Sequence, residues 1–147
     1  MLKRNILLSA TIAILFSLIV VGAYVTVGGY GDACGSEVPR DWPLCSGGLL
    51  PPPSWGPIVE YAHRLLAAFS TLFLIVTTVV FWRAAQSTGV SRRILTAASV
   101  LLILQVLLGG VVVAAYLAPA LVALHQAVAI LIFGLAVAAL SSQRRHD

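Results

Sequence analysis

Long uncharged stretches are the feature that most restricts how this chain can fold. Three of them run over Asn5–Gly31, Leu65–Trp82 and Ile94–Gln143, and none contains Asp, Glu, Lys or Arg. An α-helix crosses the hydrocarbon core of a bilayer in about 20 residues, so the third stretch must contain two crossings. Residues 116–119, Tyr-Leu-Ala-Pro, mark the break between them, because proline cannot continue a preceding helix.

The sequence therefore predicts an all-α integral membrane protein, a single domain over 1–147 with four transmembrane helices in one bundle. The expected helices cover about 5–27, 58–82, 92–115 and 120–141. Only 10% of the residues are charged, against roughly 25% in soluble domains. The first span has basic residues before it, as a signal peptide would. Its apolar run is about twice the 7 to 15 residues of such a peptide, so we expect the helix to be retained.

The basic residues predict the orientation. Only Arg40 and Arg64 lie on the side of the long connecting loop, over residues 28–57, and the other seven lie on the opposite side: Lys3, Arg4, Arg83, Arg92, Arg93, Arg144 and Arg145. The side rich in Lys and Arg is cytoplasmic. We thus expect a multi-pass protein of the plasma membrane with both termini in the cytoplasm and the loop outside the cell. The basic charge follows from this topology, and the predicted partner is the lipid bilayer, with no nucleic acid.

The predicted outer loop is rich in turn-forming residues and holds both cysteines. Thirteen of its 30 residues are Gly or Pro. Cys34 and Cys45 face an oxidising compartment on this topology, so we expect a disulfide. It is either a structural bridge, stabilising the fold by roughly 2 to 3 kcal/mol, or a redox-active pair. Trp42 and Trp55 suit either anchoring at the membrane interface or covering a flat ligand.

Two histidines lie just inside the outer ends of predicted helices. His63 is about five residues into the second helix and His125 six into the fourth, which places both rings about 8 to 9 Å below the outer end at ~1.5 Å per residue. Two neutral imidazoles at one depth suit the iron of a low-spin haem. The alternative is two separate hydrogen bonds between helices. His146, in the tail, is expected to be solvated.

Two charged residues flank the first of these histidines. Glu60 is three residues before His63 and shares its helix face, where a carboxylate can exchange protons with the outer aqueous phase. Arg64 suits a haem propionate, because guanidinium offers two charge-assisted hydrogen bonds. An ordinary Glu60–Arg64 pair is the alternative. In the third helix, Gln105 and the pair Gly109–Gly110 stand out, and adjacent glycines permit close approach of a helix or a porphyrin.

Several segments, taken in order, resemble the haem A synthases: GAYVTVGG, DWPLC, VEYAHR, QVLLGGVVV and LHQA. The resemblance begins near Gly22, covers nearly the whole chain, and is greatest to the amino-terminal half of the eight-helix bacterial enzyme, as in a compact archaeal-type form. It implies that His63 and His125 are the iron ligands, Glu60 the catalytic carboxylate, and Cys34 with Cys45 the outer-loop disulfide. Ten residues separate the cysteines here, where the family usually has six.

The same resemblance implies a reaction, the oxidation of the C8 methyl group of haem O to a formyl group, giving haem A for terminal oxidases. A haem B in the second half of the bacterial enzyme passes electrons, so a one-half chain is expected to form a homo-oligomer. Haem O synthase and an electron acceptor are the other implied partners. Three alternatives are open: a bis-histidine b-type cytochrome that leaves its haem unchanged, a four-helix thiol oxidoreductase, and a small multidrug-type transporter.

Overall fold

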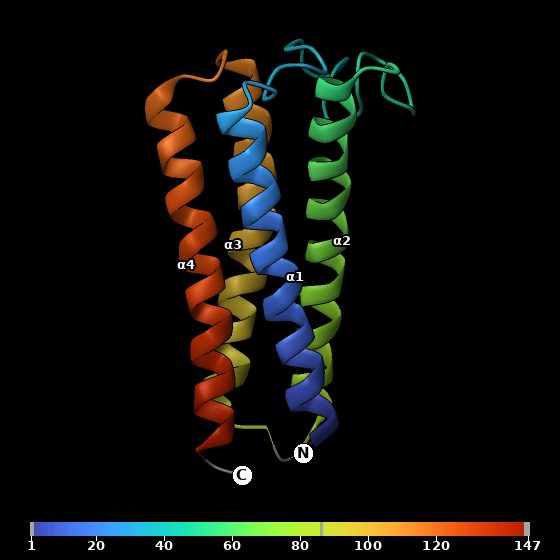
Figure 1. Ribbon diagram of the computed structural model, residues 1–147. Coiled ribbons are helices and arrows are strands. Elements are labelled where there is room, and N and C mark those ends of the chain that lie inside the picture. The colour runs from blue at the N-terminus through green and yellow to red at the C-terminus, as the bar shows by residue number, and fades with distance from the viewer. Residues whose placement is uncertain (1, 86, 146–147) are drawn as a thin grey trace.

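A computed structural model describes residues 2–85 and 87–145. Over these residues the chain forms four helices: α1 (Leu2–Val27), α2 (Trp55–Arg83), α3 (Gly89–Ala114) and α4 (Pro119–Arg144). The helices run alternately up and down, so both chain ends lie at one end of the bundle, the termini end, and segment 28–54 lies at the other, the loop end (Figure 1). All four are long and apolar enough to cross a membrane. The predicted all-α, four-span fold is confirmed, and the orientation remains a prediction.

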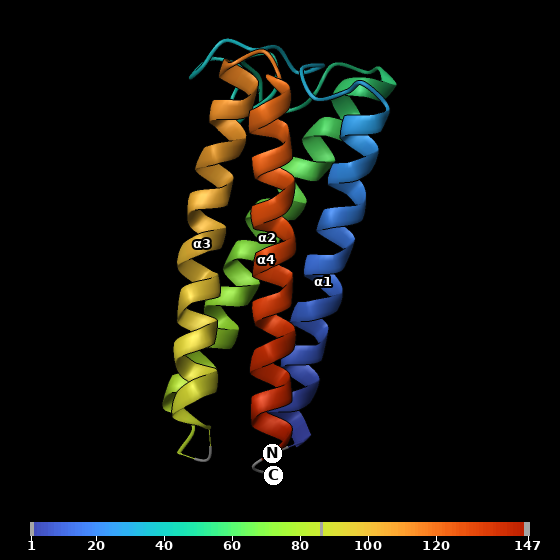
Figure 2. The ribbon, with the colours of Figure 1, turned by 90° about the vertical axis from the view of Figure 1, so that its left-hand side faces the viewer.

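The four helices form a closed ring in which each packs against two neighbours. The contacts join α1 to α2, α2 to α3, α3 to α4 and α4 back to α1. Two views at right angles show the same arrangement (Figures 1 and 2). The helices α2 and α4 are therefore diagonal partners, as are α1 and α3. Inward side chains on α2 and α4 face each other across the centre of the bundle.

Most helix ends lie one to three residues beyond the predicted ones, whereas α3 ends one residue before its predicted end. An uncharged stretch stops at the first charge, whereas the helical backbone continues through the basic residues at the termini end, as α2 does through Arg83. At the loop end, α2 also starts early, at Trp55, although Pro57 lies in its first turn. Proline is tolerated there because the first-turn N–H groups have no partner within the helix.

The turn between α3 and α4 falls at the predicted break. Tyr116 and Leu117 have positive φ angles of 51° and 58°, and Pro119 is the first residue of α4. The turn also contacts the long loop, since a Cβ on Gly31 would lie 3.1 Å from Leu117 Cδ2. The two connections therefore form one cap over the loop end of the bundle.

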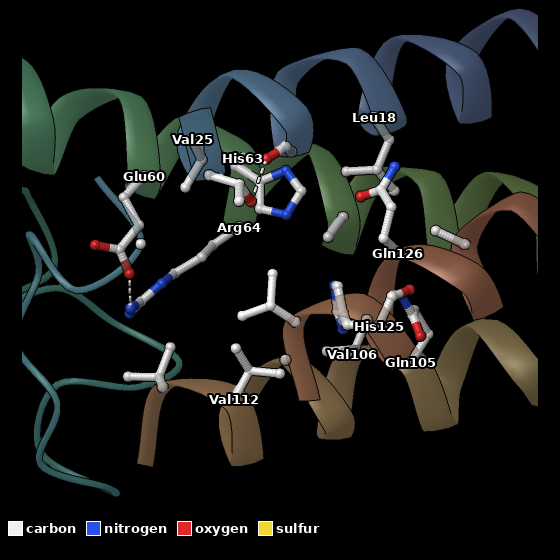
Figure 3. Close-up of a pocket in the computed structure, with 18 of the residues that line it drawn as sticks. Leu18, Val25, Glu60, His63, Arg64, Gln105, Val106, Val112, His125 and Gln126 are labelled. Atoms are coloured by element: carbon white, nitrogen blue, oxygen red, sulfur yellow. Dashed lines mark hydrogen bonds and ion pairs between the residues drawn. The ribbon is translucent and has the colours of Figure 1, made fainter. Parts of the chain in front are cut away.

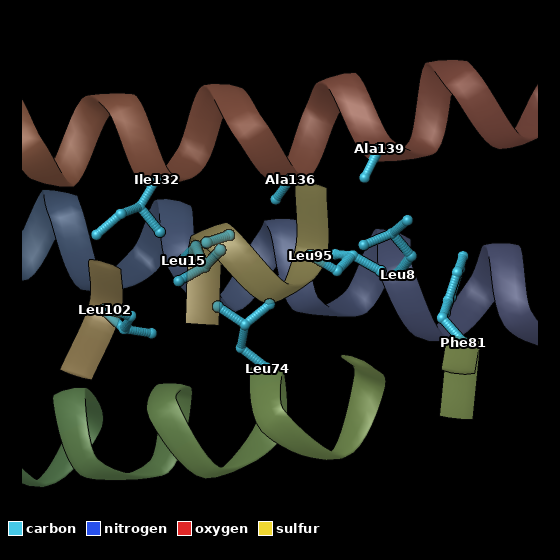
Figure 4. Packing of buried hydrophobic residues seen from close by; sticks show 10 residues of the cluster. Leu8, Leu15, Leu74, Phe81, Leu95, Leu102, Ile132, Ala136 and Ala139 are labelled. Atoms are coloured by element: carbon cyan, nitrogen blue, oxygen red, sulfur yellow. The ribbon is translucent and has the colours of Figure 1, made fainter. Parts of the chain in front are cut away.

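The hydrophobic core occupies the half of the bundle nearer the termini, as the positions of its residues along the helices show. Figure 4 shows how these side chains pack together. All four helices contribute to it: Leu8, Leu15, Leu74, Phe81, Leu95, Ala98, Leu102, Ile132, Ala136 and Ala139. Hydroxyl groups pair across helices beside this core. The Oγ1 atoms of Thr11 and Thr77 are 2.9 Å apart. Since lipid is as apolar as these side chains, close packing and such hydrogen bonds hold membrane helices together.

Candidate functional site

A cavity of about 920 Å³ lies in the loop-end half of the bundle, lined by all four helices and the long loop. Its floor is formed by Leu15, Leu102 and Ile132, which belong to the hydrophobic core. Ligand pockets commonly measure about 300 to 1,000 Å³, so this one is large enough for a big cofactor. Its polar lining includes every site residue predicted within the membrane.

The two predicted imidazoles enter this cavity from opposite sides. His63 comes from α2 and His125 from its diagonal partner α4 (Figure 3). The Nδ1 atom of each ring is buried and makes no hydrogen bond within the described residues. The protein therefore holds neither ring by a hydrogen bond at Nδ1, while both rings line the cavity. Two imidazoles facing one large cavity fit the axial ligands of a haem iron.

The predicted equal offsets of the two histidines are wrong in detail. Because α2 starts at Trp55, His63 lies eight residues after its first residue, whereas His125 lies six after the first residue of α4. Two residues correspond to about 3 Å of helix rise. Both rings nonetheless line the same cavity. The third histidine, His146, lies outside the described residues.

Each imidazole lies against a glycine of a neighbouring helix. A Cβ on Gly22 of α1 would be 2.9 Å from His63 Cε1, and one on Gly109 of α3 would be 3.3 Å from His125 Cε1. Gly110, the other glycine of the predicted pair, lies against a different residue. A Cβ on Gly110 would be 3.1 Å from the Trp42 ring, which lines the cavity from the loop.

Glu60 is buried beside the cavity with both carboxylate oxygens engaged. Its Oε2 accepts a hydrogen bond of 2.7 Å from the Cys34 backbone N–H, and its Oε1 pairs with the Arg64 guanidinium. The same guanidinium donates to the backbone carbonyls of Asp41 and Leu44. The Glu60–Arg64 pair is thus present, and it fastens the loop to α2. Both side chains also line the cavity, so roles toward a ligand remain predictions.

The predicted disulfide between Cys34 and Cys45 is confirmed. Both cysteines are fully buried. Thiol exchange needs an accessible sulfur, so this burial favours the structural role. Beside the bridge, Arg40 donates to the Asp41 carboxylate at 3.0 Å and holds the pKa of that carboxyl below its usual range. The Glu37 N–H donates to the same carboxylate, which fixes the loop turn next to the bridge.

Gln105 has a role that the sequence alone did not assign. It is buried in α3, where its Nε2 donates a 2.6 Å hydrogen bond to the backbone carbonyl of His125. Its Oε1 has no hydrogen-bond partner among the residues described. The available signal was its position four residues before Gly109, which places both on one face of α3. Gln105 therefore ties α3 to α4 at the level of the imidazole.

The fold and the cavity define a class of protein: a multi-pass membrane protein whose four-helix bundle presents two imidazoles and a carboxylate to one internal site. A family model described as cytochrome oxidase assembly protein, COX15-CtaA, matches residues 55–147. The chain belongs to this family.

Curated relatives are named Heme A synthase. One from Bacillus licheniformis is 33% identical over 123 residues, covering 84% of this chain and 39% of the relative. One from Alkalihalophilus pseudofirmus is 33% identical over 105 residues, covering 71% and 34%. A third, from Listeria monocytogenes serovar 1/2a, is 29% identical over 136 residues, covering 90% and 43%. The chain thus spans about two fifths of the length of these relatives. No solved structure matches it.

Proposed function

We propose that this protein is a haem A synthase, which oxidises the C8 methyl group of haem O to a formyl group. The observation that carries the proposal is the pair of imidazoles from diagonal helices on one large cavity, with a buried carboxylate at its edge. Membership of the COX15-CtaA family supports it, as do relatives named Heme A synthase. The formyl group withdraws electron density, which raises the potential of the haem delivered to a terminal oxidase.

In this proposal, His63 and His125 would be the residues that hold the haem iron. Both rings line the cavity, and imidazole is a common axial ligand of haem. The remaining wall of the cavity is mostly apolar, which suits a porphyrin. The floor formed by Leu15, Leu102 and Ile132 limits how deeply the group can enter. The two imidazoles and this floor would therefore set both its orientation and its depth.

Glu60 is proposed to handle protons and to position water as the methyl carbon is oxidised. The oxidation takes one oxygen atom from water and releases protons and electrons, and the electrons pass to the proposed electron acceptor. A carboxylate at the cavity edge near the loop can accept such protons and release them toward the loop side. Its hydrogen bonds with Cys34 and Arg64 hold it in one place. Arg64 is proposed to bind a propionate as well, through donor positions not used by the loop carbonyls.

A second haem site is needed if this chain follows the scheme of the bacterial enzyme, in which a haem B passes electrons. We propose that a homo-oligomer supplies that site. Haem O synthase as donor of the substrate and an electron acceptor complete the proposed partners. Crosslinking in membranes, followed by mass measurement, would detect the oligomer, and a strictly monomeric active enzyme would contradict it.

Extraction of the bound haems after co-expression with a haem O source tests the function directly. Haem A in the extract is the expected result. Bound haem with a low-spin spectrum but no haem A would instead favour a bis-histidine b-type cytochrome. The absence of any Soret band would leave the thiol oxidoreductase and transporter alternatives, although the buried disulfide argues against the first of these.

We further propose that both termini are cytoplasmic and that the loop with Cys34 and Cys45 is outside the plasma membrane. Seven of the nine basic residues lie at the termini end or its connections, and such residues accumulate on the cytoplasmic side. A membrane-impermeant thiol reagent, applied to intact cells, is expected to label a cysteine introduced at the exposed loop residue Leu50. Labelling only after lysis would reverse the orientation.

A further inference from the structure

Both intramembrane histidines of the described chain meet a glycine in the same way. His63 on α2 lies against Gly22 on the adjacent helix α1, and His125 on α4 lies against Gly109 on the adjacent helix α3. The arrangement therefore occurs once in each pair of helices joined at the loop end. In both cases the ring atom nearest the glycine is Cε1.

The position of Cε1 gives this contact its chemical importance. In an imidazole, Cε1 is bonded to both ring nitrogens, so pressure on it moves whichever nitrogen faces the cavity. A Cβ at Gly22 would be 2.9 Å from this atom, closer than carbon atoms pack. The imidazole can turn about the two torsions of its side chain. The ring would therefore rotate away before the two helix backbones separated. The expected consequence is a misplaced ligand in an otherwise intact bundle.

We propose that Gly22 and Gly109 are positioning residues, each setting the plane of one imidazole by leaving room for its Cε1 edge. The inference rests on the proposed haem ligation. The Gly22 contact is the closer one, since the corresponding distance at Gly109 is 3.3 Å. An added methyl group therefore disturbs His63 more than His125.

Gly134 provides a matched control. It lies within α4, and a Cβ added there would meet nothing within 4 Å. Alanine is also a better helix former than glycine, so an unobstructed Gly→Ala change should not weaken a helix. Two roles for a glycine can therefore be told apart by substitution. Replacing a glycine that only lets helices pack closely lowers the thermal stability of the protein, whereas replacing one that positions a ligand changes the geometry of that ligand.

The experiment compares the full-length wild type with Gly22→Ala, Gly109→Ala and Gly134→Ala, each purified with its haem. Absorption and electron paramagnetic resonance spectra report the low-spin fraction and the axial geometry, and thermal melting reports stability. We expect Gly22→Ala to shift haem from low to high spin or to lose it, and Gly109→Ala to show a smaller shift in the same direction. Gly134→Ala should match the wild type. Melting temperatures of the haem-free proteins should not fall.

A wild-type spectrum and haem content in Gly22→Ala would overturn the inference, as would equal losses in Gly22→Ala and Gly134→Ala. If Gly22→Ala lowers the melting temperature, the double variant with His63→Ala decides the cause. Restored stability identifies the ring as the group displaced and supports the inference, whereas unrestored stability indicates backbone packing and overturns it. A wild type without haem would contradict the proposed function and this inference together.

Discussion

The two ends of the bundle use the same kind of helix for opposite purposes. Near the termini, side chains fill the centre and hydroxyls pair between helices, as Thr78 does with Ser99 at 2.9 Å. Near the loop, the centre is a cavity, and His63, His125 and Gln105 each keep a buried polar atom without a hydrogen-bond partner in the described chain. The difference lies in the centre of the bundle, which is filled near the termini and open near the loop.

Unpartnered buried nitrogens at the termini end have a different character. Arg4 and Arg92 each have one, but each guanidinium makes another hydrogen bond, to Ser87 and to the Ala84 carbonyl respectively. By contrast, the Nδ1 atoms of His63 and His125 at the loop end have no hydrogen-bond partner within the described residues. The loop end is therefore the half whose open cavity a bound group would fill. The comparison gives five predictions.

The largest effect is expected from removing either imidazole. His63→Ala and His125→Ala should behave alike, converting a low-spin haem to a high-spin one or emptying the site, because each removes one of two strong-field ligands. Optical and electron paramagnetic resonance spectra measure this. His146→Ala is the histidine control and should change nothing. A low-spin spectrum at full occupancy in either intramembrane variant would remove the basis for the loop-end site.

Glu60→Gln, at the loop end, should stop the oxidation of haem O without preventing haem binding. The amide keeps an acceptor for the Cys34 N–H but cannot take up protons, so conversion of haem O to haem A should stop while bound haem remains. Haem extraction from membranes measures both quantities. Glu37→Gln, at an exposed loop carboxylate paired with Arg40, is the matched control. Unchanged conversion in Glu60→Gln would exclude Glu60 from the reaction.

Leu74→Ala should lower the stability of the fold and leave the haem site unchanged, because Leu74 lies in the packed half. Leu74 is fully buried in the core, and truncating such a side chain costs about 2 to 5 kcal/mol of stability. The spectrum of haem in the protein that remains folded should equal that of the wild type. Thermal or denaturant unfolding in detergent measures the loss of stability. A shifted spectrum would show that the two halves are coupled.

Removing the disulfide tests how far the loop stabilises its own end. The Cys34→Ser, Cys45→Ser variant should lose roughly 2 to 3 kcal/mol in the chain-entropy treatment and retain haem and part of its activity. The Cys34 backbone N–H that binds Glu60 does not depend on the sulfur. Unfolding and turnover are measured on the same preparation. Complete loss of turnover at unchanged stability and haem content would instead indicate thiol chemistry.

The smallest effect is expected at the hydroxyl pair of the packed half. Thr77→Val removes the interhelical hydrogen bond to Thr11, and such bonds in membranes contribute about 0.6 kcal/mol, at most about 1.7. Unfolding measurements should show this loss with unchanged haem content. Thr71→Val is the control, since the Thr71 hydroxyl bonds only within its own helix, to the Ala67 carbonyl. Equal losses in both variants would argue against the interhelical contribution.

Local features of the sequence predicted much of the site. The uncharged stretches gave the four spans because helix length and bilayer thickness are fixed quantities, and the paired cysteines in one loop gave the disulfide. His63, His125 and Glu60 are predicted site residues because polar residues are rare in such spans, and all three line the one cavity. The helix ends were placed up to three residues short, because charge marks the membrane boundary and not the end of hydrogen bonding.

The sequence by itself determined which segments cross the membrane and which residues are available for chemistry. The tertiary structure alone decided which of them meet: His63 and His125 on diagonal helices, Gly22 and Gly109 against their rings, and the Gln105 amide on the His125 carbonyl. The physical reason is that composition and spacing fix the depth of a residue along its helix. The rotation of each helix about its axis, and its neighbours in the ring, are set only when all four helices pack together.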